Sequence, residues 1–264
     1  MKKYLVIGNP IDHTLSPKLH NYWIKQNNLN AVYDKKQIKE TDIPEIITEV
    51  KNGKINGINV TVPFKKSVIP FLDQLTSLAN KVQSVNTIFK KDNQVVGDNT
   101  DVGGFEQGLK HINYDLKNKK VFILGSGGVV PSIILALKRL GASKIFLSNR
   151  TKEKAENLKK THPNLEIIDW GQSPDFDMII NATSLGLKNN DQIELDYNKF
   201  RSNKLFYDVI YNPSKTNFLL KGEKLGNQTT NGKMMFIYQA QLAFKTWHNV
   251  LPKIDNKVIK LLDL

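Results

Sequence analysis

Apolar runs alternate with polar, glycine-rich turns along the first hundred residues of the chain. The run at 3–8 (KYLVIG) predicts a strand, and a helix is expected from Pro17, with Leu19, Tyr22 and Trp23 on one face and Ser16 as its cap. A second apolar run, INGINVTVP, predicts a strand that ends at Pro63, and 86–99 predicts a hairpin turning through KDNQ. The pattern therefore predicts a first α/β unit that ends near the sequence GDNTD at 97–101.

A second unit begins with the apolar run of residues 119–150. This segment predicts a buried strand, a glycine-rich turn, a helix and a second buried strand, which together form a βαβ unit. Two further apolar runs, DMIINAT and KLFYDVIY, predict parallel strands. The last long apolar segment, 234–248, is an amphipathic helix with Phe236, Ala240, Ala243 and Trp247 on one stripe.

These patterns predict an α/β protein of two domains with a cleft between them. An N-terminal domain with a mostly parallel, mixed sheet is expected at 1–101, and a Rossmann-type domain at 102–233. The C-terminal helices at 234–264 are expected to pack back on the N-terminal domain.

Composition narrows the function classes. The chain has 264 residues and no cysteine, which excludes disulfides, zinc–thiolate sites and cysteine nucleophiles. The five histidines show no metal-ligand spacing, so no metal site is expected. The first apolar run is too short for a signal peptide and no run is long enough for a membrane span, so we expect a cytoplasmic protein that does not bind membranes.

The net charge of +13 raises the alternative of nucleic-acid binding. Of the 38 basic residues, however, only Arg139, Arg150 and Arg201 are arginine, and the lysines form no block of five or six. Proteins that bind phosphates and bases favour arginine and clustered charge. The lysines are therefore expected to be spread over solvated faces, with no nucleic acid as partner and a field that attracts small anions.

The turn VFILGSGGVV at 121–130 predicts a dinucleotide site. Gly125 and Gly127 permit a tight turn and the close approach of backbone N–H groups to a pyrophosphate at a helix N-terminus. The third position of the G-x-G-x-x-G pattern is Val130, and such turns also occur for packing reasons alone. Its place between a strand and a helix favours the dinucleotide.

The end of the second strand indicates which dinucleotide is bound. Enzymes that use NAD usually have an acidic residue there, whereas this chain has Asn149, Arg150, Thr151 and Lys154. Arg150 can form a fork on a 2′-phosphate, and charge-assisted bonds contribute about 1.5–3 kcal/mol each. The segment therefore predicts NADP(H), the alternative being an ordinary surface arginine at the start of a helix.

Polar residues at the ends of the first-unit strands form a second candidate site. Thr61 and Lys65 lie in NVTVPFK, Asn86 in SVNT, and Asp101 in GDNTD. A lysine opposite a carboxylate can hold a carbonyl oxygen and supply a proton to it, as a ketone reductase requires. Spacing alone is equally consistent with a surface lysine and an aspartate that caps a turn.

Taken together, these segments closely resemble the shikimate dehydrogenase family over almost the whole chain. The resemblance rests on VIGNPIDHTLSPKLHN, GINVTVPFK, SVNTIF, GDNTDVGG, ILGSGGV, NRTKEK, IINATSLG, YDVIYNPSKT and NGKMMFIYQAQLAF. It implies NADPH-dependent reduction of 3-dehydroshikimate to shikimate, a step of aromatic amino-acid biosynthesis, without a metal.

The resemblance also implies roles for individual residues. It implies that Lys65 and Asp101 form the catalytic pair. It implies substrate contacts from Thr14, Ser16, Thr61, Lys65, Asn86, Asp101, Tyr211 and Gln239. It implies cofactor contacts from Gly125, Ser126, Gly127, Gly128, Val129, Asn149, Arg150, Thr151, Lys154, Val209 and Gly232.

Several positions depart from the family's usual pattern. Thr14 stands where serine is common, Val130 and Pro131 follow the glycine-rich turn, and Val102 replaces a glycine. These departures bear on substrate choice and cofactor affinity. A relative acting on quinate or another cyclic hydroxy acid, or a catalytically silent binding protein, remain alternatives, and a monomer or homodimer is expected.

Overall fold

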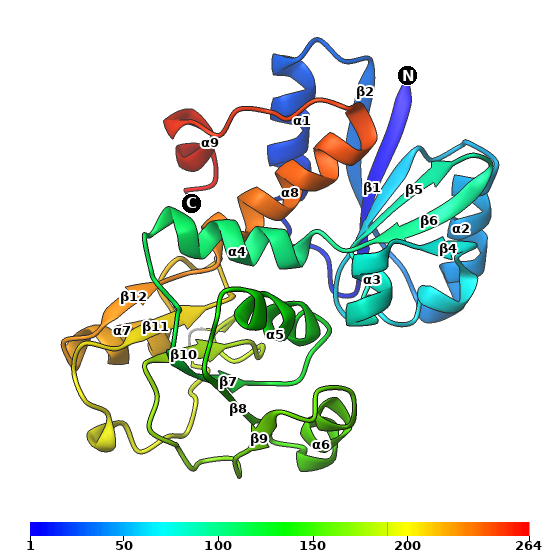
Figure 1. The fold of residues 1–264 in the computed structure, drawn as a ribbon. Helices are drawn as coiled ribbons and strands as arrows, with labels where there is room; N and C mark the ends of the chain where they lie inside the picture. Colours follow the sequence, from blue (N-terminus) through cyan, green and yellow to red (C-terminus); the bar gives the residue numbers. More distant parts are fainter. Residues whose placement is uncertain (189, 264) are drawn as a thin grey trace. The chain divides into compact units, whose positions relative to one another are not determined.

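The computed structural model describes residues 1–188 and 190–263, which form two units (Figure 1). The first unit comprises Met1–Gly104 together with Ile237–Leu264, and the second comprises Phe105–Phe236. The boundaries between the units fall within two helices, α4 (Asp101–His111) and α8 (Lys233–His248).

The first unit is built on a six-stranded mixed sheet in the order β2-β1-β3-β5-β6-β4. β1 pairs in parallel with β2 and β3, and β4 pairs in parallel with β6, whereas β5 is antiparallel to both β3 and β6. The elements are β1 (Lys2–Gly8), α1 (Ser16–Gln26), β2 (Ala31–Gln37), η1 (Glu40–Asp42), α2 (Ile43–Lys51), β3 (Gly57–Val60), η2 (Ile69–Phe71), β4 (Gln74–Leu75), α3 (Ser77–Val82), β5 (Thr87–Lys91), β6 (Gln94–Asp98) and α9 (Asn256–Leu261).

Helices cover both faces of this sheet because side chains alternate along its strands. On one face, aliphatic residues of α2 pack against Ile7, Ile58 and Val60 of the strands. On the other face, the indole of Trp247 in α8 covers Gly57, and its Nε1 donates to the carbonyl oxygen of Ile88 (3.1 Å). A Cβ at position 57 would lie 2.7 Å from Trp247 Cδ1, so only glycine leaves room for this ring.

Local predictions for this unit have two different outcomes. The hairpin forms between β5 and β6, and its turn residues Asp92 and Asn93 both have positive φ (49° and 65°), as a tight hairpin turn requires. The prediction that Ser16 caps the first helix is wrong. The N-cap is Leu15, and the hydroxyl of Ser16 instead accepts a hydrogen bond from Thr14 (3.1 Å).

The second unit contains a parallel six-stranded sheet in the order β12-β11-β10-β7-β8-β9, the strand order of a doubly wound dinucleotide fold. Its elements are β7 (Lys120–Leu124), α5 (Val130–Arg139), β8 (Lys144–Ser148), α6 (Lys152–Thr161), β9 (Leu165–Ile167), β10 (Met178–Asn181), η3 (Tyr197–Lys199), β11 (Leu205–Asp208), α7 (Asn217–Lys224) and β12 (Gln228–Thr230). The chain reverses its direction of strand addition between β7 and β10, and ligands bind at such points, outside the carboxyl ends of the strands.

Buried apolar runs form the strands of this sheet, as expected for a sheet covered on both faces. Phe122, Phe146, Ile179 and Phe206 pack side by side on one face, with Phe218 of α7 in the same cluster. Pro131 lies in the first turn of α5, a position where its missing N–H costs nothing. Within residues 1–188 and 190–263, none of the helices has the length and apolar character that a membrane span requires.

Candidate active site

Sheet topology gathers the polar residues of the first unit at one edge. β1, β3 and β6 run in the same direction and β5 runs against them, so the ends of the first three strands and the start of β5 lie together. The segments that leave this edge are 9–16 after β1, 61–65 after β3 and 99–101 after β6, and Asn86 directly precedes β5. Residues from four distant parts of the sequence are therefore brought to one place.

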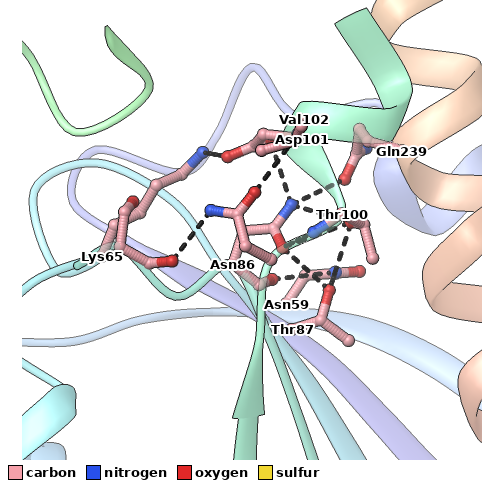
Figure 2. Close-up of polar contacts among 10 residues, drawn as sticks. Asn59, Lys65, Asn86, Thr87, Thr100, Asp101, Val102 and Gln239 are labelled. Atoms are coloured by element: carbon pink, nitrogen blue, oxygen red, sulfur yellow. Dashed lines mark hydrogen bonds and ion pairs between the residues drawn. The ribbon is translucent and has the colours of Figure 1, made fainter. Parts of the chain in front are cut away.

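A buried ion pair between Lys65 and Asp101 lies at this edge (Figure 2). Lys65 Nζ is 2.6 Å from Asp101 Oδ2, and the two residues are only 8% and 4% exposed. Asp101 is the first residue of α4, where the helix dipole favours a negative charge. Two charged groups are rarely buried this far unless they are paired, and such a pair can hold and protonate an oxygen atom of a ligand.

Asn86 connects the ion pair to its surroundings. Its Nδ2 donates to Asp101 Oδ1 (2.9 Å), Thr100 Oγ1 (2.9 Å) and Gln239 Oε1 (3.3 Å), as Figure 2 shows. Its Oδ1 accepts from the backbone N–H of Thr100 (2.8 Å) and from Thr87 Oγ1 (3.0 Å). Asn86 is 2% exposed, so the amide is held in one orientation by these partners.

A second amide supports Asn86 from the neighbouring strand. Asn59, in β3, donates from Nδ2 to the backbone oxygen of Asn86 (3.0 Å) and to Thr87 Oγ1 (3.3 Å). Its Oδ1 accepts from the hydroxyl of Tyr33 in β2 (2.6 Å). Asn59 and Tyr33 are not among the residues predicted from the sequence. The available signal was an asparagine inside the buried run GINV, where a polar side chain requires a partner.

The remaining first-unit candidates lie in loops at the same edge. The hydroxyls of Thr14 and Ser16 are 3.1 Å apart in the segment after β1, with Thr14 half-buried and Ser16 buried. Thr61 follows β3, is half-buried, and its backbone N–H donates to the carbonyl oxygen of Ile7 (2.9 Å). Gln239 is half-buried in α8. Hydroxyl and amide groups of this kind suit a small ligand that carries oxygen atoms.

The glycine-rich turn of the second unit lies directly after β7. Gly125 has φ of +105°, and a Cβ there would lie 2.8 Å from the carbonyl oxygen of Ala182. The turn continues through Ser126, Gly127, Gly128 and Val129 and enters α5, with Gly127 exposed. A turn that excludes side chains and leads into a helix N-terminus fits a dinucleotide pyrophosphate.

The segment after β8 is open to solvent. Arg150, Thr151 and Lys154 are exposed, and none of the described residues forms an ion pair or hydrogen bond with the guanidinium of Arg150. Asn149 is half-buried, and its Nδ2 donates to the carbonyl oxygen of Thr151 (2.8 Å), which shapes the turn before α6. The exposed cations at the end of this strand are placed for a phosphate substituent on a ribose.

The segment after β11 carries Val209 and Tyr211. The backbone of Gly232 packs against Val209, where a Cβ would lie 2.6 Å from the Val209 carbonyl carbon, and Gly232 N donates to Ile210 O (3.1 Å). Tyr211 stacks on Phe236 with ring centroids 4.4 Å apart. These residues belong to the second unit, so the sequence-predicted substrate contacts come from both units.

Sequence reasoning also missed a buried polar group in the second unit. Asp208, at the end of β11, and Asn181, at the end of β10, are 0% exposed and hydrogen-bonded to each other (3.1 Å). The signal was present, because DMIINAT and KLFYDVIY each carry a polar residue near the carboxyl end of an apolar run. No set of three or more histidine, aspartate or glutamate side chains placed to hold a metal occurs among residues 1–188 and 190–263.

Comparison with known proteins gives consistent matches. Residues 6–88 match the family described as shikimate dehydrogenase substrate binding domain, and residues 107–208 match the family described as shikimate / quinate 5-dehydrogenase. A curated shikimate dehydrogenase (NADP(+)) of Pelagibacter ubique is 57% identical over 263 residues, covering 100% of this chain and 99% of the relative.

Solved structures agree with these matches. A crystal structure of shikimate dehydrogenase from Aquifex aeolicus is 36% identical with a TM-score of 0.90, covering 99% of this chain and 97% of the other. A shikimate dehydrogenase crystallised in complex with NADP+ is 32% identical with a TM-score of 0.92, covering 99% of this chain and 94% of the other.

Proposed function

The chain belongs to the shikimate dehydrogenase family, and we propose that it catalyses the NADPH-dependent reduction of 3-dehydroshikimate to shikimate. The observation that carries this proposal is the buried Lys65–Asp101 pair, held by Asn86 at the edge of the first-unit sheet. A silent binding protein would have no need to keep a charged pair buried at such an edge.

Lys65 is the proton donor in this proposal. Bound NADPH supplies the hydride that adds to the carbonyl carbon of the substrate. The ammonium of Lys65 holds the carbonyl oxygen and gives it a proton as the carbon is reduced, so that the ketone becomes an alcohol. Asp101, 2.6 Å from Lys65 Nζ, orients the ammonium toward the substrate. The Asn86 amide in turn orients Asp101.

The other first-unit residues bind the substrate in this proposal. All three arginines of the chain, Arg139, Arg150 and Arg201, lie in the second unit, so no arginine fork from the first unit can hold the substrate carboxylate, and hydroxyl groups can hold it instead. The hydroxyls of Thr14, Ser16 and Tyr211 hold the carboxylate. The side chains of Asn86, Asp101 and Gln239 bind the ring hydroxyls. Thr61 lies beside Lys65 at the same edge of the sheet. A site built from polar groups rejects analogues that lack the matching hydroxyl, because its own groups are then left unpaired.

The second unit binds the dinucleotide in this proposal. The residues of the glycine-rich turn fit a dinucleotide, since there is no room for a side chain at Gly125 and the turn leads into the N-terminus of α5. Backbone N–H groups of 126–129 would hold the pyrophosphate, and Asn149 to Lys154 would hold the 2′-phosphate. Val209 and Gly232 would lie at the nicotinamide end.

An assay with two substrates and two cofactors tests the function. Initial rates with shikimate and with quinate, each with NADP and with NAD, are expected to be highest with shikimate and NADP. Faster turnover of quinate would instead support the alternative, a paralogue that acts on a related cyclic hydroxy acid. Turnover of neither acid would refute the proposal.

Substitution of Lys65 links the activity to the site. Lys65→Ala is expected to lower kcat about 10²–10⁴-fold, the usual contribution of general acid–base catalysis, with nearly unchanged affinity for NADPH. Lys66→Ala is the matched control, because Lys66 is the next residue and is exposed. Unchanged turnover in Lys65→Ala would contradict the assigned role.

The cytoplasmic location and the monomer or homodimer expected from the sequence stay predictions.

A further inference from the structure

A buried carboxylate anchors the segment that follows β11. Asp208 is 0% exposed and receives three hydrogen bonds. Its Oδ1 accepts from Asn181 Nδ2 (3.1 Å) and from the backbone N–H of Ile210 (3.0 Å), and its Oδ2 accepts from Thr216 Oγ1 (2.6 Å). The carboxylate thus joins the end of β10 to both ends of the segment 209–216.

The hydrogen-bond network around Asp208 also includes the turn that follows β10. Asn181 Nδ2 also donates to the carbonyl oxygen of Leu185 (2.9 Å), and Asn181 Oδ1 accepts from the backbone N–H and the hydroxyl of Thr183 (3.0 and 2.7 Å). The carbonyl oxygen of Ala182, in the same turn, is the group that a Cβ at Gly125 would meet. Asp208 therefore contributes to the shape of the edge where the dinucleotide turn lies.

Stability does not explain why a carboxylate is kept at this position. Burial raises the pKa of Asp208 to about 6, against the hydrogen bonds from Thr216, Ile210 and Asn181, which lower it. Because the folded-state pKa lies above the ordinary value of 3.8, folding stability falls as the pH rises from about 4 to about 6 and stays lower at higher pH. No described lysine, arginine or histidine forms an ion pair with it. Burial raises the pKa values of the neighbouring Tyr207 and Tyr197 hydroxyls, and the charge of Asp208 adds to the increase. A group that costs stability and holds a loop is expected to serve the loop's function.

We infer that Asp208 is a positioning residue for the proposed reaction, and that its carboxylate fixes the backbone of Val209–Tyr211 through Ile210, Thr216 and Asn181. The inference rests on the proposed function, which assigns Val209 to the nicotinamide end and Tyr211 to the substrate. The charged form is the functional form, since hydrogen bonds to a carboxylate are charge-assisted and about twice as strong as those to the neutral acid, which also requires the Thr216 hydroxyl to reverse from donor to acceptor. Protonation of Asp208 therefore loosens the segment and slows turnover.

The test is the dependence of kcat on pH between 5 and 9 in wild type and Asp208→Asn. With saturating 3-dehydroshikimate and NADPH, wild-type kcat is expected to fall as the pH drops through about 6. Asp208→Asn is expected to have about tenfold lower kcat at pH 8, the value of one charge-assisted hydrogen bond, and to lack this decline. A decline that persists in Asp208→Asn would belong to another group, such as the cofactor 2′-phosphate, and would refute the inference.

Substitutions at Thr216 provide an independent test should Asp208→Asn fail to fold. Thr216→Val removes one hydrogen bond to the carboxylate, so the acid decline is expected to move to higher pH, whereas Thr216→Ser keeps the hydroxyl and the wild-type profile. Thr216 also caps α7 by accepting from Leu219 N (3.4 Å), but loss of a cap alone would not move a pH profile. Identical profiles in the valine and serine variants would overturn the inference. Wild-type protein without any turnover would instead refute the proposed function.

Discussion

Mild acid is expected to destabilise the first unit through His20. The imidazole lies in α1 and is 1% exposed, stacked on Tyr33 with ring centroids 4.1 Å apart and planes 3° apart. Trp23, Trp247 and Phe244 surround it at 5.5–6.1 Å. Neither ring nitrogen has a hydrogen-bond partner among the described residues. Burial, with a smaller contribution from His248, lowers the pKa of His20 to about 3.

The magnitude follows from linkage between protonation and folding. The unfolded chain takes up the proton near pH 6.5 and the folded chain only near pH 3, so stability is complete above pH 6.5 and falls as the pH drops toward 3. Each unit by which the pH drops in this window lowers the free energy of unfolding by about 1.4 kcal/mol. The loss is therefore about 2 kcal/mol at pH 5, a large share of the roughly 5–15 kcal/mol that stabilises a typical protein.

Urea unfolding at pH 7 and pH 5, followed by tryptophan fluorescence, measures this loss. Trp23 and Trp247 report on the first unit, and His20→Phe retains an aromatic ring that cannot be protonated. Between pH 7 and pH 5, the free energy of unfolding of the variant is expected to fall by about 2 kcal/mol less than that of wild type. His13→Gln, at an exposed position, is the control and should lose as much as wild type. Equal losses in wild type and His20→Phe would refute the argument.

Two further predictions concern the second unit. Arg150→Asp removes an exposed cation and places a carboxylate near the 2′-phosphate, so KM for NADP is expected to rise about ten- to hundredfold while kcat with saturating cofactor stays close to wild type; an unchanged KM would contradict the assignment of the 2′-phosphate site. Gly232→Ala forces a Cβ against the backbone of Val209, so kcat should fall and the unfolding free energy should drop by about 1–3 kcal/mol. A variant with wild-type kcat and melting temperature would show that this close packing is not required.

The fold was largely predictable because its signals are local. Buried parallel strands appear as short apolar runs, and the glycine-rich turn between 124 and 130 identifies the point where a dinucleotide fold begins. The hairpin at Asp92 and Asn93 was equally clear, since both residues tolerate positive φ. The cap at Ser16 was mispredicted because the rule concerns the residue before the first turn, and the helix begins one residue earlier than expected.

The candidate site was predictable as a set of residues but not as a geometry. Asn86 and Gln239 are 153 positions apart, and only the topology of the first-unit sheet and α8 brings them within 3.3 Å. The positioning groups were missed for a related reason. Asn59, Asn181 and Asp208 stand inside apolar runs, where sequence patterns indicate burial but do not reveal the partner of a polar side chain.

The two parts of the dinucleotide site differ in how freely they can change during evolution. Gly125 is constrained by its own backbone conformation and by the carbonyl group of Ala182, so almost every mutation there damages the fold. The side chain of Arg150 is exposed and forms no hydrogen bond or ion pair with another described residue, so its replacement changes the stability of the fold little. Mutations can therefore explore the choice between the two nicotinamide dinucleotides while the phosphate turn stays the same. Cofactor preference is expected to diverge among close relatives sooner than the ability to bind a dinucleotide.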